Sequence, residues 1–429
     1  MPRQQKTRSN RKARSIPEEV PSMGELLFRR ETVLGILLAT DKPYCTMKRL
    51  TLQMSRFTQS ADCNPVFPMM HLTVVLPIRN EEAHIAEVLD RLLAQNYDHD
   101  KLEIIVADGM SDDRTPQIVQ EYVQKYPHIV RYFENPKRLS CGARNIGAKN
   151  AKGEAVLIVD GHCIIDNDDM LRNVSDAFEK TGADCLGRPQ PLEMKDATTL
   201  QWAIATARRS PLGHHPDSFI YSGEAQFSPA SSVAVAYRKS VFEKVGYFDE
   251  NFDACEDVEM NTRIDAAGLK CYFDPAIAVR YVPRSTLKGL EYQMERYGRG
   301  RVRLWRKHRH TASWKSFAPG VFVLVILFAF FFAFPLSLFS IHFLGADFFE
   351  GPLVANILCI PLIVCIFGAI PYMPAILVES VRLSSNQKRR DILLFLPVVF
   401  LVIHTYYGWG ILREFFFPKR HESRERNEV

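Results

Sequence analysis

The sequence lacks the features that would mark a disulfide-bonded, zinc-binding or nucleic-acid-binding protein. Its nine cysteines are scattered and form no Cys-x-x-Cys pair, so they indicate reduced thiols rather than a zinc site or a set of cross-links. A large excess of one charge is also missing, because 54 Lys and Arg residues stand against 49 Asp and Glu residues, for a net charge of +5. Such a small net charge predicts no nucleic-acid partner.

The glycine-rich turns that commonly hold nucleotides are absent as well. The first clear strand, residues 72–77 (LTVVLP), is followed by Ile78, Arg79 and Asn80, whereas a dinucleotide-binding turn would place glycines there. Residues 142–149 (GARNIGAK) contain two glycines but not the Gly-Lys-Ser/Thr ending of a phosphate-binding loop. Other groups would therefore have to hold any nucleotide.

From residue 71 onward the sequence contains a regular alternation of strand and helix patterns. Apolar, β-branched runs alternate with segments whose apolar residues recur at helical spacing. The expected strands are 72–77, 102–108, 129–133 and 155–160, and the expected helices are 81–95, 116–126 and 140–151. This alternation predicts an α/β fold, a Rossmann-like and mainly parallel sheet with flanking helices.

Polar side chains follow three of these strands at one edge of the expected sheet. Glu81 comes after the first strand, Asp108 ends the second, and Asp160 ends the fourth, closely followed by His162. Because ligands of open α/β sheets bind at the carboxyl ends of the strands, these side chains are candidates for holding a nucleotide and a divalent cation. Two alternatives stay open: a carboxylate at a strand tip is commonly a helix cap, and His162 can act through a hydrogen bond instead of as a ligand.

Four motifs, in this order and spacing, resemble those of the family 2 glycosyltransferases of the GT-A fold. They are PIRNEE, VADGMSDDRT, GARNIGAKNAKGEAVLIVDGH and GYFDENFDACEDVEMNTRIDAAG, and the resemblance covers residues 71–306. It is greatest to the succinoglycan-biosynthesis type of membrane-anchored glucosyltransferase, which also carries Asp-Gly-His in place of the usual Asp-x-Asp. The resemblance implies an inverting, metal-dependent transfer of a sugar from a UDP-sugar.

The resemblance also implies roles for single residues. Five residues would bind the sugar nucleotide: Pro77, Glu81, Asp108, Arg144 and Asp160. Asp160 and His162 would occupy the two metal-binding positions of Asp-x-Asp, and His162 departs from the usual second Asp. Since imidazole is a softer ligand than carboxylate, we expect a divalent cation with Mn²⁺ favoured over Mg²⁺.

Two further carboxylates, Glu256 and Asp257, match the Glu-Asp motif of the family. The resemblance implies that they are catalytic and that Asp257 is the base that takes the proton from the acceptor hydroxyl. General-base assistance of this kind contributes roughly 10²–10⁴-fold in rate. A structural interpretation is compatible with the catalytic one: both residues would lie in the acidic first turn of a helix.

A basic amphipathic segment follows the α/β region. Within it, Gln293, Arg296 and Tyr297 resemble the Gln-x-x-Arg-Trp motif with which processive synthases bind their acceptor, and Tyr in place of Trp argues against processivity. The positive charge of this segment would suit anionic lipid headgroups. Its basic side chains include Arg299, Arg301, Arg303, Arg306 and Lys307.

The longest apolar runs lie near the C-terminus, at residues 317–344, 352–376 and 392–412. Each is long enough to be a candidate membrane span. The basic loop at 382–390 predicts that this loop and the sugar-nucleotide domain are cytoplasmic. Three spans would place the basic tail on the opposite side, so either the charge rule is overridden there or one segment is re-entrant.

The sequence therefore predicts five regions along the chain. They are a partly disordered extension (1–70), a GT-A domain (71–285), an interfacial segment (286–316), a transmembrane region (317–415) and a polar tail (416–429). The expected enzyme is a multi-pass inner-membrane glycosyltransferase that assembles a surface polysaccharide on a polyprenyl-diphosphate-linked saccharide, with other polysaccharide-assembly proteins as candidate partners. A processive polysaccharide synthase and a catalytically silent membrane scaffold are the alternatives.

Overall fold

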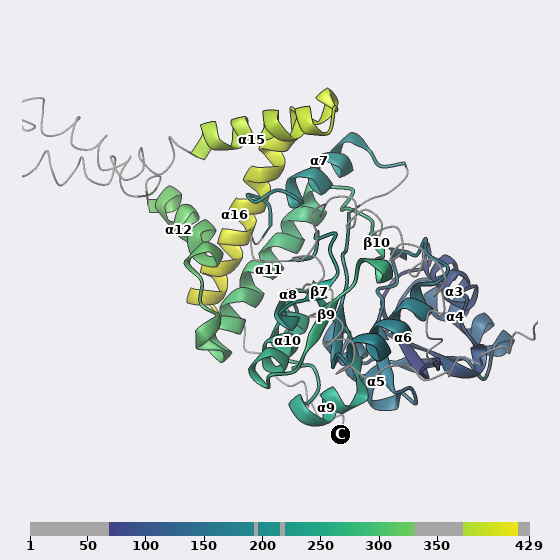
Figure 1. Cartoon of the computed structure of the whole chain (residues 1–429). Helices are drawn as coiled ribbons and strands as arrows, with labels where there is room; N and C mark the ends of the chain where they lie inside the picture. Colours follow the sequence, from purple (N-terminus) through teal and green to yellow (C-terminus); the bar gives the residue numbers. More distant parts are fainter. Residues whose placement is uncertain (1–67, 193–195, 215–218, 329–330, 332–371, 419–429) are drawn as a thin grey trace, which may run out of the picture. The chain divides into compact units, whose positions relative to one another are not determined.

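The computed structural model describes residues 68–192, 196–214, 219–328, 331 and 372–418 (Figure 1). Four expectations fall wholly or largely on other residues: the N-terminal extension up to residue 67, most of the candidate spans at 317–344 and 352–376, and the tail beyond residue 418. These expectations stay predictions.

The described strands form one eight-stranded sheet and one two-stranded sheet. In order across the large sheet they are β3 (Val130–Glu134), β2 (Leu102–Asp108), β1 (Leu72–Ile78), β4 (Ala155–Ile158), β8 (Ala234–Arg238), β6 (Cys185–Gly187), β9 (Cys271–Phe273) and β7 (Gln226–Phe227). The small sheet pairs β10 (Arg280–Tyr281) with β5 (Cys163–Ile164).

Helices flank the sheet and continue beyond it (Figure 1). The α-helices are α3 (Ile85–Leu93), α4 (Thr115–Lys125), α5 (Ser140–Asn150), α6 (Met170–Thr181), α7 (Thr199–Arg208), α8 (Ala230–Val233), α9 (Lys239–Val245), α10 (Glu256–Ala266), α11 (Leu287–Lys307), α12 (Trp314–Phe328), α15 (Tyr372–Asn386) and α16 (Phe395–Phe416). Short 3₁₀ turns are η1 (His99–Lys101), η2 (Pro275–Ile277), η3 (Arg309–Thr311) and η6 (Arg390–Ile392).

The direction of the strands decides which residues meet at one edge of the sheet. β1, β2, β3 and β4 run parallel, as the sequence predicted. β8 is antiparallel to both β4 and β6, so β6 runs in the same direction as β4. The sheet therefore contains both parallel and antiparallel pairs, and with its flanking helices it forms an α/β fold. The carboxyl ends of β1, β2, β4 and β6 share one edge of the sheet.

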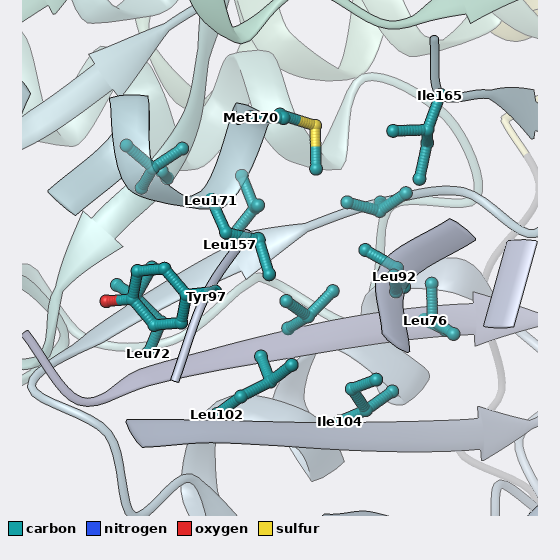
Figure 2. Close-up of a cluster of buried hydrophobic side chains, with 14 of the residues drawn as sticks. Leu72, Leu76, Leu92, Tyr97, Leu102, Ile104, Leu157, Ile165, Met170 and Leu171 are labelled. Atoms are coloured by element: carbon teal, nitrogen blue, oxygen red, sulfur yellow. The ribbon is translucent and has the colours of Figure 1, made fainter. Parts of the chain in front are cut away.

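The central strands of this sheet are buried on both faces. Their sequences are therefore continuous apolar runs, without the alternation of apolar and polar residues found in strands with one exposed face. Figure 2 shows side chains of β1 and β2, such as Leu72, Leu76 and Ile104, packed with Leu92 of α3 and Met170 of α6. This packing fixes the strand tips that carry the polar side chains.

Helix α5 approaches the other face of the sheet closely at Gly147. A Cβ atom added there would lie 2.2 Å from Cγ1 of Val75 in β1, a separation that real side chains do not reach, so glycine is needed for this contact. The close approach sets the position of α5 and of Arg144, which α5 carries.

The C-terminal helices pack on the domain. Helix α16 lies alongside α11 (Figure 1), and side chains of α7, α11, α15 and α16 share an apolar core. Among the described residues, α16 is the one helix long and apolar enough to cross a membrane. It coincides with the third predicted span, whereas α12, the described part of the first, is shorter. Multiple membrane spans stay a prediction.

The arginines of α11 differ in environment from what the sequence suggested. Arg299 and Arg303 are buried at 5% and 9% exposure, and both pair with Glu414 of α16. The expectation that they face lipid headgroups is wrong, because the buried carboxylate of a distant helix takes up their charge.

Candidate active site

Glu81 and His162 meet at the tip of β1. The Nδ1 atom of His162 lies 2.9 Å from Oε1 of Glu81. Gly161 makes this approach feasible, because a Cβ atom at that position would lie 2.7 Å from Cγ2 of Ile78. The hydrogen bond to Glu81 raises the pKa of His162 above its ordinary value. Glu81 therefore contacts a candidate metal ligand at this edge of the sheet.

Asp160 lies beside these two residues, at the tip of β4. Its Oδ2 accepts a 2.8 Å hydrogen bond from the hydroxyl of Tyr281 in β10. Its Oδ1 is 3.8 Å from Nη2 of Arg144. Burial opposes ionisation of Asp160, but the charge of Arg144 outweighs it with help from His162 and Tyr281, so the pKa of Asp160 is lowered. Asp160 is thus a stable carboxylate.

Arg144 connects this edge to the first turn of α10. Its Nη2 lies 3.7 Å from Oε1 of Glu256 as well as near Asp160, and its guanidinium sits 5.6 Å from the centre of the Phe248 ring. Glu256 is buried at 7% exposure, and this burial raises its pKa. One guanidinium therefore joins the strand tip to the Glu-Asp motif.

Asp257 follows Glu256 at the start of α10. Its Oδ1 accepts a 2.8 Å hydrogen bond from the backbone N–H of Val258. The residue before the helix, Cys255, has φ +62°, a left-handed conformation that residues with a side chain rarely adopt. The motif is therefore both an acidic helix start and a group of carboxylates at the candidate site, as the two compatible interpretations allowed.

Asp108 and Pro77 are placed less openly than expected. Asp108 is 1% exposed and accepts hydrogen bonds from the N–H and hydroxyl of Ser111 and from the hydroxyl of Tyr132. Pro77 lies within β1, opposite Ala107 of β2. Both residues shape the edge of the sheet, and the carboxylate of Asp108 is already used by local donors.

The three candidate acceptor residues lie together on α11. Nε2 of Gln293 donates a 3.2 Å hydrogen bond to the hydroxyl of Tyr297, and the guanidinium of Arg208 in α7 sits 5.7 Å from the centre of the Tyr297 ring. Arg296 donates to the carbonyl of Asp253, in the loop before α10. The group therefore borders the Glu-Asp motif.

Sequence reasoning missed Arg188, which follows β6 at the same edge. Arg188 is 1% exposed, and its Nη2 donates to the carbonyl of Ile158 at 3.1 Å. Its Nε and Nη1 have no hydrogen-bond partner in the part of the chain that the structure describes. The strand-tip rule that found Asp160 would have found Arg188, but β6 is too short to be recognised from its pattern. No local signal pointed to Tyr281, because pairing of β10 with β5 brings it to Asp160.

Within the described ranges, no three His, Cys, Asp or Glu side chains are grouped to hold a metal ion. Asp160 and His162 offer one carboxylate and one imidazole, and the hydrogen bond that Nδ1 of His162 donates to Glu81 leaves Nε2 for a ligand. Ligating histidines commonly donate their other ring N–H to a carboxylate in this way. The pair fits a divalent cation that takes its remaining ligands from a substrate.

Comparison with known proteins identifies the family of the chain. The model of glycosyl transferase family 2 matches residues 73–246, and that of glycosyl transferase family group 2 matches residues 166–371. The succinoglycan biosynthesis protein ExoA of Rhizobium meliloti is 28% identical over 248 residues, which cover 57% of this chain and 73% of ExoA. The chain belongs to the family 2 glycosyltransferases, and it is a glycosyltransferase.

Two other proteins are similar over more of the chain. A dolichyl N-acetyl-alpha-D-glucosaminyl phosphate 3-beta-D-2,3-diacetamido-2,3-dideoxy-beta-D-glucuronosyltransferase of Methanococcus voltae is 25% identical over 348 residues, which cover 80% of this chain and 97% of that protein. Among solved structures, the mannosyltransferase PcManGT of Pyrobaculum calidifontis, in complex with GDP-Man and Mn²⁺, has a TM-score of 0.48 and 17% identity, with 86% of this chain and 95% of that one covered.

Proposed function

We propose that the protein transfers a sugar from a UDP-sugar, with inversion, to a polyprenyl-diphosphate-linked saccharide during assembly of a surface polysaccharide. The observation that carries this proposal is the position of Arg144 between Asp160 and Glu256. It places a strand-tip carboxylate, which suits a donor site, next to a helix start that carries a candidate base. Donor and acceptor sides would then meet in one site.

On the donor side, Arg144 would neutralise a diphosphate, and Pro77, Glu81, Asp108 and Asp160 would line the nucleotide sugar. The contact with His162 changes the role expected of Glu81, which would orient the imidazole as well as bordering the donor. Asp160 and His162 would hold a divalent cation, Mn²⁺ rather than Mg²⁺. When bound, this cation would offset the negative charge that develops on the departing diphosphate.

On the acceptor side, Asp257 would act as the base. It would take the proton of the acceptor hydroxyl while the hydroxyl oxygen forms a bond to the anomeric carbon. The bond from that carbon to the diphosphate oxygen breaks at the same time, and UDP leaves with the electron pair. Glu256 would hold the first turn of α10 through Arg144, and Gln293, Arg296 and Tyr297 would border the acceptor.

A lipid-linked acceptor is supported by two features. The relative from Methanococcus voltae acts, by its name, on a dolichyl-linked sugar phosphate, and apolar side chains of α12, α15 and α16 are exposed, among them Val321, Leu377 and Val398. The protein would be a multi-pass inner-membrane enzyme with its catalytic domain in the cytoplasm. Other polysaccharide-assembly proteins would then act on its product.

Replacing Asp257 by Asn tests the mechanism. The substitution keeps the size of the side chain and an oxygen for the N–H of Val258, so only the basicity is lost. We expect transfer to fall by about 10²–10⁴-fold, while UDP binding, measured by calorimetry in detergent, stays unchanged. Asp176→Asn, which removes an exposed ion pair on α6, is the matched control. Unchanged transfer by Asp257→Asn would refute the assignment of the base.

The metal site has a separate test. We expect His162→Ala to weaken binding of Mn²⁺, measured in the presence of UDP, and to lower the dependence of transfer on Mn²⁺. Equal Mn²⁺ affinity in the variant and the wild type would exclude His162 as a ligand. A product that grows in length without release of the acceptor would instead favour a processive synthase.

A further inference from the structure

Helix α11 lies between α16 and the loop that leads into α10, and its backbone contacts both. A Cβ atom added at Gly298 would lie 2.1 Å from the carbonyl oxygen of Tyr407 in α16. One added at Gly300 would lie 2.8 Å from the carbonyl oxygen of Ala254 and 2.7 Å from Sγ of Cys255. Small residues allow both approaches, so a displacement of α16 is opposed directly by the backbone of α11.

Buried ion pairs also join α11 to α16. Glu414 of α16 is 2% exposed. Its Oε1 accepts a 3.0 Å hydrogen bond from Nε of Arg303, and its Oε2 accepts bonds of 3.1 Å from Nη2 of Arg303 and from Nε of Arg299. A buried carboxylate with this many charged donors holds its partners in one geometry.

Unlike Arg299, Arg303 also contacts the loop before α10. Its Nη1 also donates to Oδ1 of Asp253 at 2.5 Å, so a single guanidinium joins α16 to the loop before α10. Among the described residues, Arg299 makes no hydrogen bond or ion pair to that loop, and its Nη2 has no hydrogen-bond partner. The two arginines thus form a natural comparison pair: both bind Glu414, and only one reaches Asp253.

The loop that Arg303 contacts leads into α10, which carries Asp257 in its first turn. Arg296 donates to the backbone carbonyl of Asp253, and Cys255 enters α10 in the left-handed conformation. A backbone in such a sparsely populated conformation persists only where its surroundings hold it. Contacts from α11 therefore hold the loop before α10, in addition to the contact of Arg144 with Glu256, and the partner that fixes Arg303 on the other side comes from α16.

We propose that Arg303 is a positioning residue for the transfer reaction, and that Glu414 of α16 braces it. Through Asp253, the pair holds the loop that sets the position of Asp257. The C-terminal helix is then a working part of the active site and not only an attachment to the membrane. This inference rests on the proposed role of Asp257 as the base.

The test compares Arg303→Met with Arg299→Met in the full chain, purified in detergent. Each variant removes one arginine from Glu414 and keeps an apolar stem of similar length, so both should lower the melting temperature, Arg303→Met by more because Arg303 makes more hydrogen bonds. Misplacing a catalytic group by about 1 Å can cost roughly 10²-fold in rate. We expect kcat to fall roughly 10- to 100-fold in Arg303→Met and by less than about 3-fold in Arg299→Met. The KM for the UDP-sugar should stay the same in both.

Equal losses of kcat in the two variants would overturn the proposal, since a merely structural role does not distinguish them. Asp253→Ala gives an independent measurement if Arg303→Met does not fold. It should reproduce the loss of kcat, and Asp253→Asn, which keeps an oxygen for Nη1, should restore most of it. No loss of kcat in Asp253→Ala would also overturn the proposal.

Failure of the base assignment would look different. In that case Asp257→Asn would retain transfer, whatever Arg303→Met does. If Asp257→Asn is impaired while Arg303→Met and Arg299→Met are equal, the base assignment stands and the positioning role of Arg303 is refuted.

Discussion

Replacing Arg144 by Met tests two roles of this side chain, stabilisation of the fold and binding of the donor. In the structure its Nη2 lies 3.8 Å from Asp160 and 3.7 Å from Glu256, and its guanidinium lies over the ring of Phe248. Met keeps much of the apolar volume and removes the charge. Two carboxylates then lose the cation that compensates them.

The expected loss of stability follows from burial. Breaking a buried ion pair costs about 3–5 kcal/mol. The Asp160 side chain keeps 27% exposure and the pairs are longer than hydrogen bonds, so the lower value, about 3 kcal/mol, applies. At about 2–4 °C per kcal/mol for a domain of this size, the melting temperature should fall by roughly 6–12 °C.

Loss of donor binding is the second expected effect. A hydrogen bond to a charged group contributes about 1.5–3 kcal/mol, which is roughly 10- to 150-fold in Kd. Calorimetry with UDP in detergent measures this change, at a temperature where the variant is folded.

Arg238→Met is the matched control for both measurements. Arg238 also pairs with a carboxylate, Glu179, at 3.6 Å, and also lies over a ring, that of Phe178, at 5.1 Å. It sits at the opposite edge of the sheet, so its loss should lower stability and leave UDP affinity unchanged. Equal UDP affinity in Arg144→Met and wild type would refute the role of Arg144 in donor binding.

Three further outcomes are expected. Burial opposes ionisation of Glu103, but hydrogen bonds from three donors outweigh this effect and lower the pKa of Glu103. Glu103→Gln should therefore lower the free energy of unfolding by about 2–3 kcal/mol at neutral pH. Because the pKa of Glu103 is lower in the folded state, the ionised carboxylate stabilises the fold above the unfolded pKa of about 4.3. The difference in free energy of unfolding between Glu103→Gln and wild type should therefore shrink as the pH falls below that value. A difference that stays constant with pH would contradict this. In Gly147→Ala the new Cβ would lie 2.2 Å from Cγ1 of Val75, so the free energy of unfolding, measured with denaturant, should fall by about 3 kcal/mol. In Gly223→Ala the new Cβ would have no described atom within 4 Å, so the free energy of unfolding should not change. Arg188→Met should raise the melting temperature of the ligand-free chain, because it removes a buried charge of which two nitrogens have no hydrogen-bond partner among the described residues, and it should weaken UDP binding. A lower melting temperature would contradict the first expectation.

The first half of the sheet could be predicted because its information is local. The apolar runs of β1, β2 and β4 are bounded by turn residues, and each helix between them repeats apolar residues at helical spacing. The parallel order then follows from the rules for βαβ units, and it correctly placed Glu81, Asp108 and Asp160 at one edge.

The second half of the sheet could not be read in the same way. β6, β7 and β9 are short, and pairing with strands distant in the sequence decides their existence. The residues that depend on this pairing, Arg188 and Tyr281, were missed for that reason.

Contacts between distant residues explain the remaining differences. The bond between His162 and Glu81 depends on how closely the β4 turn approaches the tip of β1. The pairing of Glu414 with Arg299 and Arg303 depends on docking of two helices, and a lone acidic residue near the end of an apolar helix gives no sign of its partner.

The docking of α16 on α11 has a consequence for any contact of this helix with a membrane. Since the charged helix α11 lies along one side of α16, lipid would have to reach α16 from another side, where Val398 and Trp409 are exposed. A bilayer that α16 crosses, as its length and composition allow, would therefore meet the face that carries these two side chains, and the face against α11 would stay within the protein.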